Sequence, residues 1–448
     1  MPDALATPAH APRTAHDAPP VAERYRRVRA FTETLCEPLA TEDYVVQTMK
    51  DVSPTKWHLA HVTWFFETFI LREHAAAYRP LNEAYAYLFN SYYLQAGERH
   101  CRDQRGWITR PTVREVYAYR RHVDDAMTAL LEEADEEKSA KLAPLVEIGL
   151  HHEQQHQELL LTDIKHVLSV NPLRPVYRSG STADAEGGRR GGESSDPVPL
   201  EWVHFEEGLH RIGHAGDGFC YDNETPRHRH FLDGFLLANR LVTNGEYLEF
   251  MEDGGYERGE LWLSEGWAVA RERGWSEPFY WEKRDGRWAR FTLRGPRPVR
   301  AHEPVCHLSY FEADAYARWA GARLPTEQEW EVAAGTVPVA GNLVESDRLD
   351  PAAASPAPAA PGEAVPRLLQ MYGDVWEWTR SQYGPYPGYE PLPGALGEYN
   401  GKFMSNQFVL RGGSCATSVT HIRPTYRNFF PADATWQFMG VRLAKDAR

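Results

Sequence analysis

The sequence predicts two domains, a bundle of α-helices followed by an α+β domain. The chain has 448 residues, more than one ordinary hydrophobic core serves. Over 21–177 the apolar residues recur at helical spacing, whereas over 201–448 short apolar and aromatic runs alternate with Gly, Pro and Asp turns. The stretch 178–200 between them is rich in Gly, Ser and Arg, which predicts a flexible linker.

Four helices are expected in the first domain, over 22–36, 54–76, 112–136 and 142–169. Helices of this length suggest an antiparallel four-helix bundle, and such bundles often build metal sites from side chains on facing helices. Two other stretches are expected to lie outside the folded cores. Residues 1–20 are Ala/Pro-rich and predict a disordered tail, not a signal peptide, and the Ala/Pro stretch 351–362 predicts an exposed loop.

Bulk composition narrows the class of protein. The formal net charge of −14 argues against nucleic acid as the main partner, because binding phosphates needs a basic surface. No apolar run reaches 18 residues, so we expect no membrane span. The five cysteines form no CxxC pair, which disfavours a disulfide framework and a cysteine zinc site and fits a cytoplasmic location. The sequence does not indicate the oligomeric state.

The sharpest chemical signal is the run from His152 to Glu158, which reads HEQQHQE. On a helix His152 and His156 lie one turn apart on one face and could bind one metal ion, although a polar face in water fits the motif equally well. Glu158 lies about 200° around the helix from His156. It is therefore a poor third ligand and is expected to accept a hydrogen bond that orients an imidazole. Gln155 shares the metal-facing stripe and could reach a substrate.

A third ligand should come from another helix. His58 and His61 lie in a strongly apolar stretch that must be buried, where an unpartnered histidine is costly. They are three residues apart, so either could face the core. Three neutral imidazoles with open positions suit Fe(II) or Zn(II), and the residues alone do not choose between these ions.

Together these residues resemble the ergothioneine (hercynylcysteine) sulfoxide synthases. That family joins a DinB-like four-helix bundle to a formylglycine-generating-enzyme-like domain, which is C-type-lectin-like and also called a sulfatase-modifying factor fold. The resemblance runs from about residue 22 to 444. Its motifs are LAH at 59–61, HxxxHxE at 152–158, GARLPTEQEW at 321–330, GDVWEWT at 373–379, RGGS at 411–414 and GVRL at 440–443.

The resemblance implies an enzyme with an Fe(II) cofactor held by His61, His152 and His156. The implied reaction is O₂-dependent formation of a C–S bond between hercynine, which is Nα-trimethylhistidine, and cysteine, giving a sulfoxide in ergothioneine biosynthesis. Formylglycine-generating enzymes themselves need two cysteines after RGGS. Those places hold Thr417 and Ile422 here, so copper–thiolate chemistry is not expected.

The resemblance also implies the residues around the metal. A Tyr-Tyr pair supplies the active-site phenol in one branch of the family, which points to Tyr93 first and Tyr92 second; Tyr383 is an outside candidate. Arg102 and Arg105 are expected to bind the carboxylate of the thiol substrate, unless they form only a solvated turn.

Substrate contacts to hercynine are expected from Gln155, Asn428 and Phe429, the last through cation–π attraction. Phe430 stands where the γ-glutamylcysteine-using branch has an aspartate, which favours free cysteine as the donor. Other hypotheses stay open: γ-glutamylcysteine or a selenium compound as donor, an ovothiol-type enzyme that acts on histidine, or a non-catalytic lectin-like binding module with a zinc-stabilised bundle.

Overall fold

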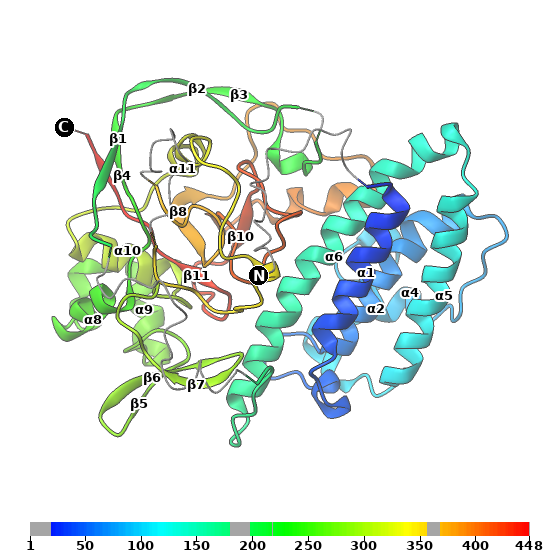
Figure 1. The fold of residues 1–448 in the computed structure, drawn as a ribbon, viewed down its shortest axis with the longest axis horizontal. Coiled ribbons are helices and arrows are strands. Elements are labelled where there is room, and N and C mark those ends of the chain that lie inside the picture. Colours follow the sequence, from blue (N-terminus) through cyan, green and yellow to red (C-terminus); the bar gives the residue numbers. More distant parts are fainter. Residues whose placement is uncertain (1–18, 180–197, 217, 356–367, 448) are drawn as a thin grey trace, which may run out of the picture.

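The computed structural model describes residues 19–179, 198–216, 218–355 and 368–447. Most of the expected N-terminal tail, most of the linker and part of the loop over 351–362 lie outside these residues. In Figure 1 the helical domain occupies one side of the molecule and the mixed domain the other, with α6 running along the boundary between them.

The first domain is the predicted four-helix bundle, which confirms this part of the fold. Its long helices are α1 (Val21–Cys36), α2 (Thr55–Phe66), α5 (Val113–Glu132) and α6 (Glu136–Val170). Helices α2 and α6 approach closely, because a Cβ added at Gly149 would lie 2.4 Å from the ring of Phe66. This close approach brings the side chains of α2 and α6 into one core.

The helix expected over 54–76 is present, but it is not a regular α-helix throughout. The single helix expected over 54–76 is interrupted by a π-helical turn, Glu67–Leu71, and resumes as α3 (Arg72–His74). The buried Glu67 accepts hydrogen bonds from the hydroxyls of Tyr78 (2.5 Å) and Tyr119 (2.7 Å), a tertiary contact that helical periodicity does not reveal. The aromatic segment before Asn90 forms the short helix α4 (Tyr85–Phe89).

Buried charges tie the bundle together. Arg29 donates to Glu153 at 2.9 Å, and Arg120 donates to the other oxygen of the same carboxylate at 3.2 Å. Thr32 donates to Glu153 at 2.7 Å. Burial alone would raise the pKa of Glu153, but the two guanidinium groups hold it at about 2, so the group is ionised inside the core. Helices α1, α5 and α6 are thereby joined at one point.

Within its described residues the second domain forms four small sheets. One joins β1 (Trp202–Phe205), β4 (Phe235–Ala238) and β12 (Ala444–Asp446), and a second joins β10 (Asn428–Phe430), β9 (Phe408–Arg411), β8 (Trp376–Gln382) and β11 (Met439–Gly440). The others are β2 (Gly208–Ile212) with β3 (His228–Leu232), and β5 (Trp281–Arg284), β6 (Arg287–Thr292) and β7 (Gly295–Pro298). Helices α8 (Asn244–Glu252), α9 (Ser264–Arg273), α10 (Tyr310–Trp319) and α11 (Glu327–Ala334) pack among them.

The sequence motifs of this domain bind one another in its core. Glu377 of β8 accepts hydrogen bonds from the Trp330 indole of α11 (2.9 Å) and from Arg442 (2.7 Å). Arg411 of β9 donates to Glu331 of α11 at 2.9 Å. Strands β8 and β9 pair antiparallel, with Glu377 opposite Arg411. These motif residues therefore specify the fold. None of the described helices is long and apolar enough to cross a membrane.

Helix α6 also forms the contact between the domains. Gln154 donates to Ser418 at 3.1 Å, and the Lys165 ammonium lies 2.6 Å from Nε2 of His307. Because the same helix belongs to the bundle core, its remaining face is set against the loops that follow β9.

Candidate metal centre

Three imidazoles gather where α2 and α6 cross. Helix α2 supplies His61, and α6 supplies His152 and His156 from consecutive turns. One ring nitrogen from each lies within 4.8 Å of the others, and Nε2 of His61 is 3.1 Å from Nε2 of His152. His61 and His152 are fully buried. The structure thus brings together the three histidines that the resemblance implied.

The protonation of these rings suits metal binding. Nδ1 of His61 donates to the carbonyl of Phe89 at 2.6 Å, which leaves its Nε2 as the lone-pair atom. Burial lowers the pKa of His152 to about 3 and lowers those of His61 and His156 well below the usual range, so all three are neutral. A metal ion binds neutral imidazole.

The donor set therefore fits a divalent metal ion. Two nitrogens that each lie ~2.1 Å from one ion are about 3 Å apart when they bind at right angles, which matches the 3.1 Å between His61 and His152. His58, the alternative on α2, is directed elsewhere, because its Nε2 lies 2.9 Å from Asp163. The geometry favours His61.

Three tyrosines, Tyr92, Tyr93 and Tyr399, lie near the imidazoles and are called the tyrosine wall below. Tyr93 is fully buried, and its hydroxyl has no hydrogen-bond partner within the described residues. Burial raises its pKa well above the usual value, and the neighbouring phenol of Tyr92 raises it further, so Tyr93 keeps its proton. The rings of Tyr92 and Tyr93 stack with centroids 4.6 Å apart. The ring centroid of Tyr399 lies 5.7 Å from that of His152 and 6.5 Å from that of Tyr93, so this ring is near both the metal centre and the phenol pair.

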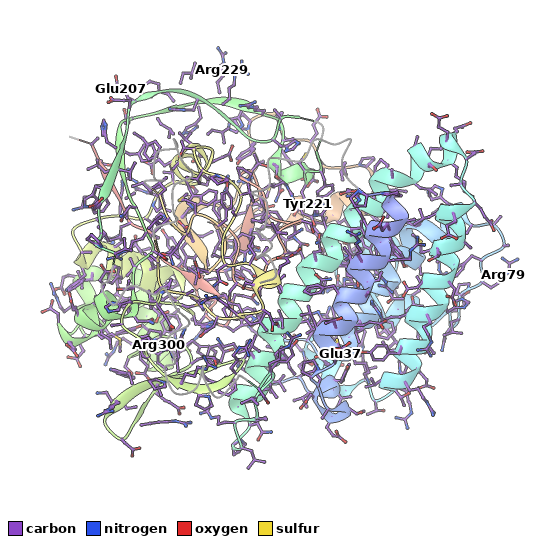
Figure 2. The ribbon with its side chains drawn as sticks, in the orientation of Figure 1. Glu37, Arg79, Glu207, Tyr221, Arg229 and Arg300 are labelled. Carbon is purple, nitrogen blue, oxygen red and sulfur yellow. The ribbon has the colours of Figure 1, made fainter. Side chains whose placement is uncertain are left out.

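The second domain supplies tyrosines that sequence reasoning missed. Gln155 accepts a hydrogen bond from the hydroxyl of Tyr399 and donates to that of Tyr426. Tyr221 stacks on Tyr399 with centroids 5.0 Å apart, and Figure 2 shows it at the boundary between the domains. No motif marks these residues among the 22 tyrosines of the chain, so only the fold identifies them.

The two predicted arginines, Arg102 and Arg105, lie in different environments. Arg105 is buried, and its guanidinium carbon lies 3.3 Å from the ring centroid of Trp57, which in turn stacks on His61 at 4.5 Å. Arg102 is exposed and donates to the backbone carbonyl of Asp51 at 2.8 Å. Of the two arginines, only Arg105 is therefore close to the metal centre, with the ring of Trp57 between its guanidinium and His61.

The predicted contacts on β10 divide between the two faces of the strand. Phe429 stacks on Tyr383 at 4.0 Å and reaches Tyr92 through the ring of Phe403, which lies 5.8 Å from Phe429 and 5.0 Å from Tyr92. Successive side chains on a strand point to opposite faces, and Phe430 packs against Trp436 with centroids 5.8 Å apart.

The remaining predicted residues lie further from the imidazoles. Asn428 accepts a hydrogen bond from the backbone N–H of Phe429 at 2.9 Å. Tyr383 lies behind Phe429, and its hydroxyl accepts from Asn223 at 2.9 Å. The structure shows no contact of Asn428, Phe430 or Tyr383 with the three histidines among the described residues, whereas Phe429 is connected to the tyrosine wall.

Glu158 has a different role from the expected one. Its carboxylate accepts hydrogen bonds from the Trp376 indole (2.8 Å), from Ser414 and from Thr417 (2.6 Å), all in the second domain. The rotation of about 200° that separates it from His156 carries it to the opposite face of α6. Glu158 therefore joins the domains, and the expectation that it orients an imidazole is corrected.

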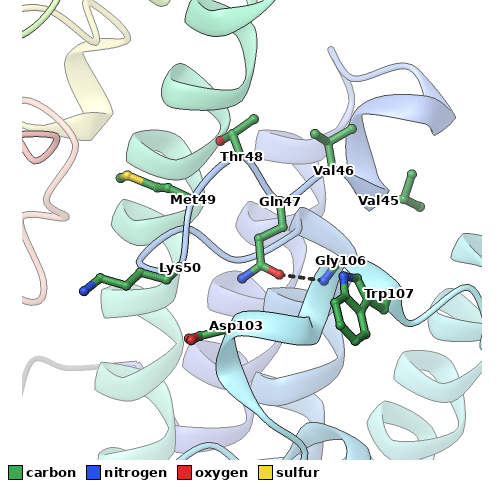
Figure 3. Close-up of a pocket in the computed structure, with 9 residues that line it drawn as sticks. All are labelled: Val45, Val46, Gln47, Thr48, Met49, Lys50, Asp103, Gly106 and Trp107. Carbon is green, nitrogen blue, oxygen red and sulfur yellow. Dashed lines mark hydrogen bonds between the residues drawn. The ribbon is translucent and has the colours of Figure 1, made fainter.

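A surface pocket of about 350 Å³ lies outside the turn that carries Arg105. It is lined by Val45, Val46, Gln47, Thr48, Met49, Lys50, Asp103, Gly106 and Trp107. Two of these residues are bonded to each other, because the Gly106 N–H donates to the Gln47 side chain at 2.7 Å. Figure 3 marks this bond with a dashed line. None of the three histidines lines it, so the pocket does not belong to the metal centre.

Comparison with known proteins identifies the family. Residues 24–160 match the DinB superfamily, and 194–447 match the sulfatase-modifying factor enzyme 1-like domain. The hercynine oxygenase of Mycolicibacterium thermoresistibile is 33% identical over 421 residues, which cover 88% of each chain. The hercynine oxygenase of Mycobacterium tuberculosis is 34% identical, covering 72% of this chain and 74% of its own, and that of Mycolicibacterium smegmatis is 35% identical, covering 66% and 70%. The chain thus belongs to the hercynine oxygenase family of iron-dependent oxidoreductases.

Proposed function

We propose that this protein is an iron(II)- and O₂-dependent sulfoxide synthase that joins the sulfur of free cysteine to the imidazole ring of hercynine. The cluster of His61, His152 and His156 carries the proposal, because three neutral imidazoles hold a metal ion and leave positions open for substrates. The three relatives named hercynine oxygenase support the choice of hercynine.

Fe(II) held by the three histidines would supply the activation of O₂ and the oxidation of sulfur. The protein side chains bind and orient the two organic substrates beside it, which is mainly a proximity effect. Tyr399 lies beside His152 and donates a hydrogen bond to Gln155. The surrounding aromatic rings suit the trimethylammonium group of hercynine through cation–π attraction.

Arg105 is proposed to bind the carboxylate of the thiol substrate. It is buried beside Trp57, where a guanidinium–carboxylate pair would be shielded from water. Arg102 faces solvent, so a single buried guanidinium stands near the metal centre in the described part of the turn. One carboxylate matches free cysteine, whereas γ-glutamylcysteine carries two.

The proposed preference for free cysteine as the thiol donor can be tested kinetically. We expect kcat/KM for cysteine to exceed that for γ-glutamylcysteine by at least tenfold at saturating hercynine. Leaving the additional charged groups without partners costs roughly 1.5–3 kcal/mol, or about one to two decades. Both rates should be measured on one preparation by oxygen consumption and product mass. A tenfold preference for γ-glutamylcysteine would overturn the assignment of the donor.

Tyr93 is proposed to donate a proton during the reaction and to steer it toward C–S bond formation. In Tyr93→Phe the change removes a buried hydroxyl that lacks a partner among the described residues, so folding should survive. We expect C–S bond formation to slow by about 10²-fold, a usual contribution of general acid catalysis, while more thiol is oxidised to a sulfinic acid. The measurement is the product ratio by mass spectrometry.

The matched control is Tyr92→Phe, which removes the neighbouring hydroxyl. A changed ratio in Tyr92→Phe together with an unchanged one in Tyr93→Phe would move the role by one residue. An unchanged ratio in both variants would remove the pair from the mechanism.

The proposed function itself is tested by anaerobic loading with Fe(II), followed by hercynine, cysteine and air. We expect a product with the mass of the hercynyl–cysteine sulfoxide and consumption of O₂. Loading the same protein with Zn(II) is the control, since zinc has no redox chemistry. Failure to form the sulfoxide with iron, while metal still binds, would favour the non-catalytic binding module.

A further inference from the structure

His58 lies next to the metal centre without belonging to it. Its Nδ1 is 2.9 Å from Nδ1 of His156, and its Nε2 is 2.9 Å from Oδ2 of Asp163. His58 and Asp163 are both buried. One hydrogen-bonded row therefore runs from Asp163 on α6 through His58 on α2 to the ligand His156 on α6.

The chemistry of this row fixes where each proton sits. Asp163 accepts at Oδ2, so Nε2 of His58 carries the hydrogen and Nδ1 of His58 is the acceptor. Nδ1 of His156 must then donate, which leaves Nε2 of His156 with the lone pair that a metal ion needs. The row selects the metal-binding tautomer of His156 and holds its ring in place.

We propose that His58 and Asp163 are positioning residues of the metal centre, which set the tautomer and orientation of His156. The inference rests on the proposed metal site. Partners of this kind tune metal affinity in other proteins, where a carboxylate usually contacts the ligand histidine directly. Here a second imidazole stands between the carboxylate and the ligand.

The same carboxylate oxygen also fixes the start of α2. The backbone N–H of Ser53 donates to Oδ2 of Asp163 at 2.8 Å, and Arg105 donates to Oγ of Ser53 at 2.8 Å. Asp163 thus contacts both the row that ends at His156 and the segment that holds the proposed carboxylate-binding arginine. A change at Asp163 should therefore weaken the binding of both the metal ion and the thiol substrate, whereas a change at His58 should weaken metal binding alone.

The test measures the dissociation constant of the metal-free full-length protein for Co(II), by anaerobic titration against a competing chelator. We expect His58→Phe, which keeps a ring without nitrogens, to raise the dissociation constant by about 10- to 100-fold. We expect Asp163→Leu to raise it similarly, because Nε2 of His58 then loses the carboxylate oxygen that accepts its hydrogen. The double variant should be no weaker than the weaker single variant, since both changes break one row.

Two further variants keep the result interpretable. His58→Asn retains an acceptor near the former Nδ1 and should bind Co(II) with an affinity between those of His58→Phe and the unchanged protein. His166→Phe removes a buried histidine of the same helix that bonds Thr48 at 2.6 Å, and it should leave the affinity unchanged.

An unchanged dissociation constant in His58→Phe, or effects that simply multiply in the double variant, would overturn the inference while leaving the proposed function intact. If His156→Ala bound Co(II) as tightly as the unchanged protein, the metal site itself would be misassigned and the inference would fail with it.

Discussion

Replacing His61, His152 or His156 with alanine is expected to abolish iron binding and turnover. Each variant leaves two imidazoles of the cluster, which hold Fe(II) weakly, and the neighbouring His58 is held away from the vacant place by its hydrogen bond with Asp163. Iron per chain should be measured after anaerobic loading and desalting, and turnover from consumption of O₂.

The matched control for these variants is His166→Ala, on the same helix as His152 and His156 but bonded to Thr48. It should retain one iron per chain. His58→Ala should also load fully when iron greatly exceeds the dissociation constant, since His58 is not a ligand in this assignment. Full iron in His61→Ala with lost iron in His58→Ala would reverse the assignment on α2.

The largest effect on stability is expected from Glu153→Gln. Arg29 and Arg120 both donate to this carboxylate inside the bundle, and removing its charge breaks both buried pairs, leaving Arg29 with Asp124 and Arg120 with the part-exposed Glu33. Breaking a buried ion pair in this way costs about 3–5 kcal/mol. The free energy of unfolding should be measured on the metal-free protein by urea titration, followed by far-UV circular dichroism.

Glu137→Gln provides the comparison, because Glu137 pairs with Lys141 on the exposed start of the same helix. A surface pair of this kind contributes at most about 0.5 kcal/mol. Equal losses in Glu137→Gln and Glu153→Gln would mean that the buried pair does not hold the bundle together.

Local spacing was enough to predict the bundle and the pair of imidazoles on α6. A helix of fixed pitch places His152 and His156 one turn apart wherever it packs, and its apolar stripe marks the buried face. The choice between His58 and His61 needed more. Both lie on the buried side of α2, and only the positions of Phe89 and Asp163 show which ring faces the cluster.

Contacts between the domains could not be predicted from spacing. The direction of Glu158 away from the imidazoles follows from the helix, but its partners Trp376, Ser414 and Thr417 are more than 200 residues distant in sequence. Tyr399 was missed for the same reason, since its relevance arises only where its loop meets α6.

The two domains contribute different parts of the site, although Tyr92 and Tyr93 belong to the first domain with the metal ligands. The bundle holds the imidazoles, whereas Tyr399 and Tyr426 come from loops that meet α6 across the interface fixed by Glu158. Metal binding and substrate preference can therefore change independently in evolution. The loops can diverge under selection for a new substrate while the oxidation chemistry is retained. Exchange of the loop around Tyr399 between relatives should accordingly alter substrate preference at constant cobalt affinity, and a loss of cobalt binding in such chimaeras would show that the two properties evolve together.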